Sequence, residues 1–398
     1  MPLMLSAPAR ITLLITDRNL NVLGDPIAGW TDLDVTLRFN EPGSGSFTAP
    51  ARPELLQLIA AGGNRVVVVR DGAIFAAGPI ERAGPQRWSV DGADTDPGTV
   101  TVAFTDDLAL IAGRVTYPNP AAVATAQTST ARWTATDEAG DIMRSLVNLN
   151  AGPGALTVRR VPQLVLGAGA GLGSSITFGT RFEALGDALR SAAIAGGGLG
   201  FRTQQVGTTI EFQVYAPVNR ATGDGAVRFS RGLGNLRSYS YEPVAPSATV
   251  AIVGGKDVGT SRVIVERVNS AAVTKWWRLE TFVDQRQSDA TAGAAAELEQ
   301  AGDEELERSA ETARLTSVTV DTADQRYGTH YQLGDRVSVE LNSGAEVTDV
   351  VRAVHLEVSP RDGETVTALV GSQDASADPA WVKVTRALAR RLAGLETI

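Results

Sequence analysis

The sequence predicts a mainly β protein with an α+β insertion. Two tube-like β-barrel or sandwich domains, each built as strands–helix–strands, would flank a small α+β middle domain, and a C-terminal helix would follow. Short runs of alternating apolar and polar residues recur near both ends of the chain, which is the period of a half-buried strand. The 398 residues also include 41 glycines and 18 prolines, more than a helical protein tolerates. At roughly 100–200 residues per domain, this length favours two to four domains.

Residues 1–116 are expected to form the first tube-like β-barrel domain. Apolar side chains alternate with polar ones over residues 33–40, as in a strand with one buried face. Two apolar runs in residues 66–77 flank Asp71-Gly72, a favoured hairpin dipeptide. Residues 41–46 predict a flexible polar loop between strands. Closure into a barrel or sandwich would hide the strand edges from other chains.

Residues 117–226 change in character and predict the α+β middle domain. A helix is expected over residues 136–148, with Thr136 as its N-cap, and a second helix over residues 181–195. Two strands should pair around a turn between residues 199 and 214. The glycine-rich stretch 167–173 fits no G-x-G-x-x-G register and has no surrounding βαβ unit, so it is interpreted as a flexible loop.

Residues 227–372 return to strands and predict the second tube-like domain. Its longest helix is expected over residues 288–314, where eight acidic residues stand against Arg308 and Arg314. This charge pattern indicates a solvated helix face rather than a metal cluster. Trp276 and Trp277 are expected on a strand. The strand-like runs are 227–230, 236–243, 248–254, 262–269, 276–282, 315–321, 336–341, 345–359 and 364–371.

Residues 373–398 predict a C-terminal amphipathic docking helix that begins at Asp378-Pro379. Its apolar positions recur at steps of three or four residues, and basic residues occupy much of the rest of its surface. Such a narrow apolar seam is typical of docking or oligomerisation, with packing on its own domain as the alternative. The seam residues, the candidate interaction site, are Trp381, Val384, Leu388, Leu392 and Leu395.

The composition excludes several kinds of chemistry. The chain has no cysteine, hence no disulfide, thiolate nucleophile or iron–sulfur ligand, and its only histidines are His330 and His355. Neither histidine belongs to an H-x-H, an H-E-x-x-H or a serine-elbow arrangement, so we expect no catalytic residue, metal site or cofactor. A carboxylate mechanism for glycoside cleavage stays open. The net charge of −9 argues against non-specific DNA binding.

Membrane and targeting signals are not expected either. No stretch approaches the roughly 18 consecutive apolar residues of a membrane span, so no membrane insertion by this chain is expected. Residues 1–10 have neither a basic region nor a long apolar core of the signal-peptide kind.

Four stretches, taken in order, resemble the tail-hub or minor tail proteins of long-tailed actinobacteriophages. They are residues 34–47, the hairpin that ends at residue 78, residues 139–153, and residues 331–337 with the turn Gly334-Asp335. The resemblance implies a homotrimeric baseplate hub at the tip of the tail tube. Each chain would supply two barrels, so that a trimer offers six barrels to a hexameric ring.

The resemblance favours a structural, non-enzymatic virion protein at the tail tip, assembled in the host cytoplasm. Its implied partners are its own copies, the distal tail or tail tube protein, the tape-measure protein and other tail-tip or receptor-binding proteins, with DNA only in transit during ejection. A tail-associated cell-wall hydrolase and a receptor-binding tail protein are the alternatives. The same fold would also suit a prophage or a related injection machine.

Overall fold

The computed structural model describes residues 11–87, 98–255, 262–285, 296–310, 312–360 and 363–371. The chain divides into two compact units. The first comprises Met1–Ser238 together with Ser317–Ile398, and the second comprises Tyr239–Thr316. The predicted C-terminal helix, with its seam from Trp381 to Leu395, lies outside the described residues, as do residues 288–295 of the predicted acidic helix.

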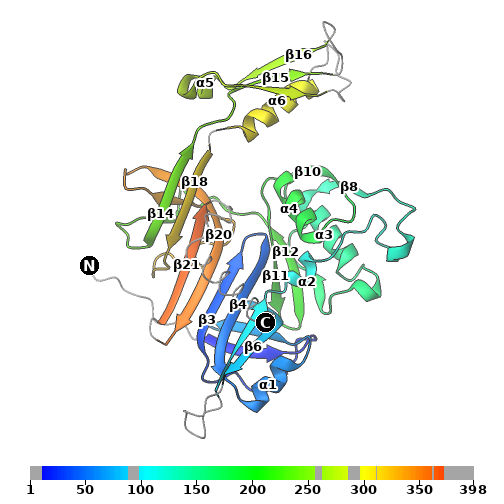
Figure 1. Ribbon diagram of the computed structural model, residues 1–398, viewed down its shortest axis with the longest axis vertical. Coiled ribbons are helices and arrows are strands. Elements are labelled where there is room, and N and C mark those ends of the chain that lie inside the picture. Colours follow the sequence, from blue (N-terminus) through cyan, green and yellow to red (C-terminus); the bar gives the residue numbers. More distant parts are fainter. Residues whose placement is uncertain are drawn as a thin grey trace, which may run out of the picture. The chain divides into compact units, whose positions relative to one another are not determined.

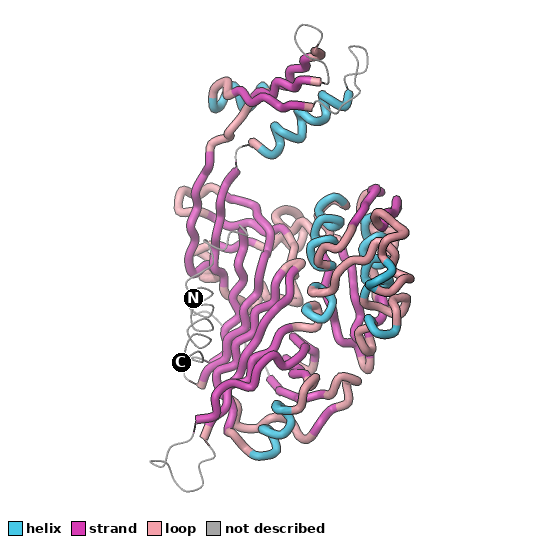
Figure 2. Tube along the Cα trace, turned by 45° about the vertical axis from the view of Figure 1, so that its right-hand side comes forward, coloured by secondary structure: helices cyan, strands magenta, loops and turns pink. Residues whose placement is uncertain are grey.

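A large sheet of 13 strands dominates the structure (Figures 1 and 2). Two of these strands, β13 (Arg228–Phe229) and β19 (Arg336–Glu340), lie beside the linear order of the others: they pair with each other, and β19 also pairs with β20 (Glu346–Ser359). In order along the sheet, the other strands are β14 (Leu236–Val244), β18 (Thr312–Thr319), β21 (Gly363–Gly371), β20 (Glu346–Ser359), β3 (Thr31–Arg38), β4 (Glu41–Pro50), β7 (Thr99–Thr105), β6 (Ala73–Arg87), β5 (Arg65–Arg70), β1 (Ile11–Thr16) and β2 (Val22–Leu23). The mainly β prediction is therefore confirmed.

The pairing of β20 with β3 joins strands from the two ends of the chain. The strands are antiparallel, with Leu356 opposite Val35 and His355 opposite Thr36. Leu356 and Val35 are both buried, so the apolar alternation of the two strands meets on one face. Both segments that predict barrels thus contribute to one sheet, while the domain boundaries at residues 116, 226 and 372 stay predictions.

The predicted loop over residues 41–46 is wrong, because these residues begin β4. The strand turns back on β3 at Asn40, whose φ is 58°. A Cβ on Gly45 would lie 2.3 Å from the ring of Phe104 on β7, so glycine lets this strand approach a buried aromatic ring. A composition typical of loops thus serves a close backbone contact here.

Another glycine of the same unit leads to a stability prediction. A Cβ on Gly78 of β6 would lie 2.0 Å from the carbonyl oxygen of Thr105, a backbone atom that cannot swing aside. We expect Gly78→Ala to lower the free energy of unfolding by about 1–3 kcal/mol, the usual cost of overpacking. Scanning calorimetry measures the effect. Gly62→Ala is the matched control, since a Cβ there meets nothing within 4 Å. Equal transition temperatures for both variants would contradict the prediction.

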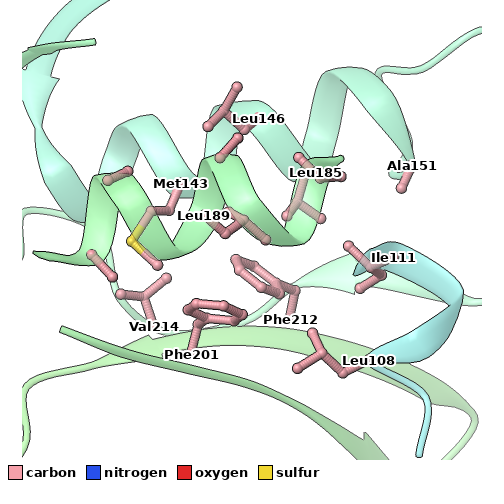
Figure 3. Packing of buried hydrophobic residues seen from close by; sticks show 14 of the residues in the cluster. Leu108, Ile111, Met143, Leu146, Ala151, Leu185, Leu189, Phe201, Phe212 and Val214 are labelled. Atoms are coloured by element: carbon pink, nitrogen blue, oxygen red, sulfur yellow. The ribbon is translucent and has the colours of Figure 1, made fainter. Parts of the chain in front are cut away.

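The middle region packs two helices on a three-stranded sheet. The helices α3 (Ala139–Asn150) and α4 (Leu185–Ala195) contact each other and cover β11 (Gly200–Val206), β12 (Thr209–Tyr215) and β9 (Leu164–Leu166). Figure 3 shows Met143 and Leu189 of the two helices above Phe201, Phe212 and Val214 of the sheet. The short helices α1 (Pro53–Ala60), α2 (Ala109–Ala112), η1 (Ala124–Ala126) and η2 (Thr157–Arg159) lie in connections.

Both predicted helix starts in this region are too early. Residues 136–138 belong to β8 (Trp133–Glu138), which pairs with β10 (Ser175–Thr180), so Thr136 is not an N-cap and α3 begins at Ala139. The hydroxyl of Thr136 instead lies 2.8 Å from that of Thr177 across the strand pair. Cross-strand partners that are distant in sequence decided the conformation.

The second unit is a three-stranded sheet in the order β16 (Ile264–Val268), β15 (Val250–Gly254) and β17 (Glu280–Asp284), with α6 (Ala296–Arg308) packed on it. The strand predicted at residues 276–282 is wrong in its first half, because α5 (Ser270–Trp276) ends at Trp276 and β17 begins only at Glu280, so neither Trp276 nor Trp277 lies on a strand. The side chain of Asn269 accepts a hydrogen bond from the amide of Ala272 and caps that helix. The predicted acidic helix ends early, because β18 begins at Thr312. None of the helices in the described residues is long and apolar enough to cross a membrane.

Candidate functional site

A cavity of about 540 Å³ opens inside the first unit. Its walls come from the first part of β6, from β11 and from the connection 326–333, which are far apart in sequence. This volume lies within the range of roughly 300–1,000 Å³ typical of ligand sites. The cavity is therefore the candidate binding site within the described residues.

Aromatic rings from three segments line this cavity: Phe75, Tyr215 and Tyr327. Phe75 and Tyr327 meet edge to face, with ring centroids 6.1 Å apart. Burial raises the pKa of Tyr327 to about 12 and also raises the pKa of Tyr215, so both phenols are neutral at pH 7. The guanidinium of Arg202 lies over the Tyr215 ring, 5.2 Å from its centroid.

Three arginines of the cavity wall, Arg70, Arg202 and Arg326, have side-chain partners. Arg326 forms an ion pair with Asp71 at 2.7 Å, and Arg70 forms one with Glu364 at 2.6 Å. Arg202 donates a hydrogen bond to a side-chain oxygen of Gln332, 3.3 Å away. These contacts connect the β5–β6 turn and β11 to the connection 326–333, and β5 to β21.

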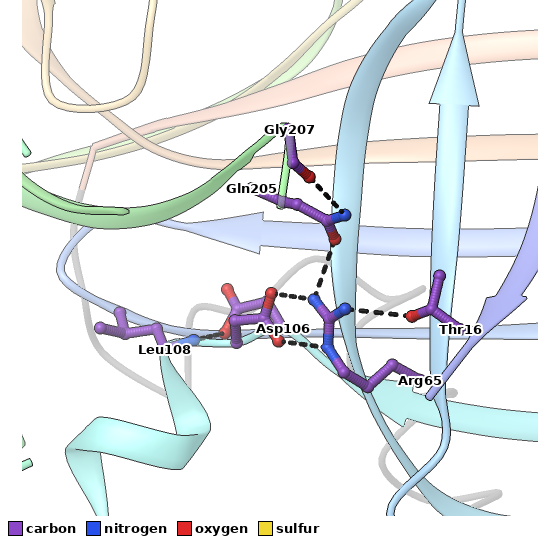
Figure 4. Close-up of polar contacts among 7 residues, drawn as sticks. Thr16, Arg65, Asp106, Leu108, Gln205 and Gly207 are labelled. Carbon is purple, nitrogen blue, oxygen red and sulfur yellow. Dashed lines mark hydrogen bonds and ion pairs between the residues drawn. The ribbon is translucent and has the colours of Figure 1, made fainter. Parts of the chain in front are cut away.

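Asp107 of the cavity wall forms a buried ion pair with Arg65, whose guanidinium is shown in Figure 4. Arg65 of β5 donates to both carboxylate oxygens of Asp107, with Nε 3.0 Å from Oδ1, and both side chains are only 3% exposed. Its remaining donors reach Thr16 on β1 and Gln205 on β11, each at 3.1 Å. One guanidinium therefore holds the middle region against the large sheet.

The neighbouring Asp106 is also buried. Its carboxylate accepts hydrogen bonds from the amides of Gly43 at 2.7 Å and Leu108 at 3.1 Å. Burial raises its pKa to about 6, because desolvation outweighs these bonds. Both acidic residues thus belong to the cavity wall, and Asp106 holds β4 to the residue that precedes α2.

The turn Gly334-Asp335, which is part of the resemblance, holds two segments of the chain together through hydrogen bonds. Gly334 has a φ of 88°, and a Cβ there would lie 2.3 Å from the Phe39 ring. The buried carboxylate of Asp335 accepts three hydrogen bonds, which hold the chain that leaves β12 against the start of β19. They come from Val218 N at 2.8 Å, Arg220 Nε at 2.7 Å and Gln332 N at 3.0 Å.

The two histidines occupy structural positions. His330 Nδ1 accepts a hydrogen bond from the amide of Arg326. On β20, His355 Nδ1 lies 3.2 Å from the Thr36 hydroxyl and 3.5 Å from an Asp34 carboxylate oxygen. The carboxylate on the opposite side of the ring, that of Glu357, lies 3.9 Å from His355 Nε2, which is longer than the roughly 2.6–3.2 Å that orients the base of a catalytic triad.

The same cluster leads to a prediction on pH. Burial lowers the pKa of His355 to about 4, so its contribution to stability is present above pH 6.5 and is lost as the pH falls towards 4. Burial and Glu357 raise the pKa of Asp34 from 3.8 to about 6, so its contribution is full at low pH and is lost as the pH rises through about 6. We therefore expect His355→Gln to lose less thermal stability than the parent on acidification from about pH 7 to pH 4.

Asp34→Asn is the matched variant, and we expect it to lose more thermal stability than the parent over the same range. Melting temperatures measured across the range test both expectations. Parallel curves for the parent and the two variants would contradict this account of the cluster.

Two other features have structural explanations. In the glycine-rich stretch, a Cβ on Gly169 would lie 2.5 Å from the carbonyl oxygen of Val214, and the amide of Val214 donates to Ala168. The stretch therefore packs along β12. The carboxylates of Asp137, Glu138 and Asp141 lie within 4.8 Å of one another at the start of α3, but exposed acidic groups are common without an ion and we assign none.

The cavity itself was not predicted from the sequence. Its residues lie in separate segments, and aromatic residues make up only 6% of the chain, so no local cluster marks them. The residues that were predicted for interaction, Trp381 to Leu395, lie outside the described residues, so their role stays a prediction.

Comparisons with solved structures place the fold among phage tail proteins. The tail protein from Neisseria meningitidis MC58 is 15% identical, with 91% of this chain and 97% of that chain covered at a TM-score of 0.51. The 43 kDa tail protein of prophage MuSo2 from Shewanella oneidensis is 12% identical, with 90% and 98% covered at a TM-score of 0.54. At these identities the likeness shows the fold alone. No curated protein sequence matches the chain.

A family model for long-tailed phages matches almost the whole described chain, from residue 12 to residue 372. This match confirms that the predicted resemblance is to a siphovirus family, while its restriction to actinobacteriophages stays a prediction. The matched range includes strands from both ends of the large sheet as well as the α+β region. The chain therefore belongs to the family of Siphovirus ReqiPepy6 Gp37-like proteins.

Proposed function

We propose that this chain is a structural virion protein of a siphovirus tail, acting as a baseplate hub or minor tail protein at the tail tip. The observation that carries the proposal is the family match over residues 12–372. The fold likeness to two tail proteins, which covers at least 90% of this chain, supports it. The actinobacteriophage origin belongs to the same proposal, with a prophage or related injection machine as another setting for this fold.

In this proposal three copies form a ring at the end of the tail tube. Residues 1–116 and 227–372 supply the two tube-like domains, so that a trimer offers six to a hexameric tail ring. The pairing of β3 with β20 supports a stiff connection between these segments, because backbone hydrogen bonds run directly from one to the other. The ring would contact the distal tail or tube protein, the tape-measure protein and other tip proteins, and would pass DNA during ejection.

Exposed apolar side chains on the second unit support a role in assembly. Trp277 is 81% exposed and Phe282 is 54% exposed. The strand registers place Phe282 on one face of the three-stranded sheet with the exposed Ile264 and Val268, and exposed apolar groups that lie together are typical of surfaces that other proteins cover. The backbone of Trp277 also has a φ of 105°, an uncommon conformation that is often found at functional positions.

The proposed mechanism is structural, without catalytic residues or cofactors. The contacts of the two histidines support this, since His330 accepts from a backbone amide and the carboxylate opposite Thr36 on His355 is 3.9 Å away. A zymogram against host cell walls tests it, with lysozyme as the positive control, and we expect no clearing at 41.7 kDa. Clearing at that mass would favour the cell-wall hydrolase instead.

Light scattering of the purified chain, with and without residues 373–398, tests the assembly. We expect about three times the 41.7 kDa mass for the full chain. Loss of the trimer on truncation would assign Trp381, Val384, Leu388, Leu392 and Leu395 to trimerisation. A trimer that survives truncation would leave this seam for a neighbouring tail protein, and a monomer of the full chain would count against the ring.

A further inference from the structure

Four arginines cluster in the middle region without carboxylates to balance them. The segments 114–117, 158–160 and 181–184 meet there, because Arg159 donates to the carbonyl oxygen of Val115 and a β-bridge joins the first segment to the third. None of the arginines in these segments forms an ion pair with another described residue; they are Arg114, Arg159, Arg160 and Arg181. The three segments contain a single acidic residue. The cluster therefore has an excess of positive charge in a chain whose net charge is −9.

Two aromatic rings lie between these arginines. The guanidinium carbon of Arg159 lies 3.6 Å from the centroid of the Tyr117 ring, and the rings of Tyr117 and Phe182 meet edge to face with centroids 6.3 Å apart. The guanidinium of Arg181 lies over the other ring, 5.6 Å from the centroid of Phe182. The order is thus cation, ring, ring, cation, and each guanidinium is attracted by the electron-rich face of its ring. These contacts position two of the arginines without neutralising them.

The charges of this cluster act on one another. Arg114 and Arg160 donate to the backbone carbonyl oxygens of Leu110 and Ala155, which orient both side chains and leave their charges in place. Burial lowers the pKa of Arg159, and the nearby charge of Arg114 lowers it further. Like charges that stay unbalanced within one molecule attract an acidic surface of another molecule and select the orientation in which the two meet.

Exposed apolar side chains accompany the arginines. Phe182 is 48% exposed, Val115 is 42% exposed and Val158 is 88% exposed. Aromatic rings and arginines beside apolar groups are typical of protein–protein interfaces, whereas the phosphates of a polyanion contact arginines and not valine side chains. A protein partner is therefore favoured. We call this surface the arginine patch; it comprises Arg114, Val115, Tyr117, Val158, Arg159, Arg160, Arg181 and Phe182.

The second unit of the chain carries the opposite charge. Over Tyr239–Thr316, thirteen aspartates and glutamates stand against eight lysines and arginines. Six of these acidic residues belong to α6, in which Arg308 is the only basic residue. α6 is therefore the most acidic of the helices in the described part of the chain, and it complements the arginine patch in charge.

The packing of α6 directs part of this acidic charge to the surface. Leu298 and Leu306 are buried where the helix packs on β15 and β16, whereas Glu299 and Asp303 are exposed. Asp303 is paired with Arg267 of β16 at 2.7 Å. Glu299 forms no ion pair with another described residue, so its charge is available to a partner.

A ring of identical copies needs two different surfaces on every chain, one for the copy before it and one for the copy after it. A single self-complementary surface would close a dimer instead. The arginine patch belongs to the first unit and α6 to the second, and their charges are opposite. Each of the two surfaces repels its own kind, so the pairing of patch with helix is favoured over patch with patch or helix with helix.

From the unbalanced arginines, the exposed rings and the acidic helix, we propose that the arginine patch of one copy contacts α6 of the next copy around the ring. The proposal rests on the ring described under the proposed function. Arg160 and Arg181 pair with the exposed acidic face of α6, which includes Glu299, and Phe182 and Val158 bury apolar area beside these pairs. Three such contacts close the ring and set the direction in which the copies follow one another.

Cross-linking of a double-cysteine variant tests the contact directly, because the chain has no cysteine of its own. In the variant with Arg181→Cys and Glu299→Cys, a short bismaleimide should join copies head to tail into covalent dimers and trimers of the 41.7 kDa chain. The matched control replaces Arg181→Cys by Arg231→Cys, at an exposed arginine outside the patch. We expect its yield of covalent trimer to be lower by at least about tenfold, because proximity raises the effective concentration only at the true contact.

Equal yields of covalent trimer in the two variants would overturn the proposal, as would cross-links confined to single chains. Light scattering of the same samples separates this proposal from the ring itself. A trimer in solution without cross-linked copies overturns the contact and leaves the ring in place. Open chains of more than three cross-linked copies support the contact and count against a ring of three. A monomer without cross-linked copies overturns both.

Charge reversal tests the chemistry of the contact in a chain without cysteine. Arg160→Glu with Arg181→Glu should raise the concentration at which the trimer dissociates at least about tenfold, because like charges then face each other. Arg52→Glu with Arg231→Glu is the matched control, with the same change of charge at two exposed arginines outside the patch. Association of the parent should also weaken as salt rises from about 0.05 to 0.5 M, since salt screens exposed charges. Equal dissociation of both variants would overturn the proposal.

Discussion

Replacement of Arg65 by methionine should lower the free energy of unfolding by about 3–5 kcal/mol, the largest effect we expect in this chain. Methionine fills a similar volume but leaves the carboxylate of Asp107 buried, 3% exposed, without its cation. The same change removes the donors to Thr16 and Gln205, which connect β1 and β11. Scanning calorimetry should show the loss in the transition of the first unit.

Two further variants separate the buried charge from the packing. In Arg65→Met with Asp107→Leu, both charges are removed, and we expect most of the stability to return, because a well-packed apolar pair avoids the cost of desolvation. The pair Arg190 and Asp187, whose side chains are 33% and 58% exposed, is the matched control, and Arg190→Met should cost less than about 1 kcal/mol. Equal losses for Arg65→Met and Arg190→Met would contradict the role of burial.

Replacement of Asp335 by asparagine should lower the free energy of unfolding by about 2–4 kcal/mol. The carboxylate accepts from Val218, Arg220 and Gln332, and the side chain is only 4% exposed. An amide cannot accept on its nitrogen, so at least one buried donor loses its partner, and Arg220 loses its counter-charge. Urea unfolding followed by circular dichroism measures the effect.

Asp324→Asn is the matched control for this change, since Asp324 lies exposed in the preceding connection. It should alter stability by less than about 0.5 kcal/mol. A small effect of Asp335→Asn, similar to that of the control, would show that the chain leaving β12 is held by its backbone contacts alone. The rate of proteolysis near Val218 should also rise in Asp335→Asn, because the chain that leaves β12 is then held less firmly and opens more often.

Local patterns predicted much of the secondary structure. The hairpin around Asp71-Gly72 and the long strand near the C-terminal end, β20, follow from alternation and turn chemistry, and the structure confirms both. The predictions for residues 41–46 and 136–138 were wrong for one shared reason. Both stretches have strand partners that lie far away in sequence, Thr105 to Ala103 opposite residues 44–46 and Ser175 to Thr177 opposite residues 138–136.

The candidate site depended even more on the tertiary structure. In the sequence, the three aromatic residues of the cavity lie in separate segments, and nothing next to them indicates a shared site; they are Phe75, Tyr215 and Tyr327. They share one cavity only because β6, β11 and the connection 326–333 converge. The turn Gly334-Asp335 was recognised from the sequence, but its three donors became visible only in the structure.

By itself, the sequence determined the mainly β class, the lack of cysteine chemistry and the siphovirus resemblance, because composition, alternation and motif order are local properties of the chain. Only the tertiary structure decided that β3 pairs with β20, that Arg65 is buried against Asp107, and that β6, β11 and the connection 326–333 meet at one cavity. Alternation tells which side of a strand is buried, whereas pairing, register and free edges arise from contacts between distant segments.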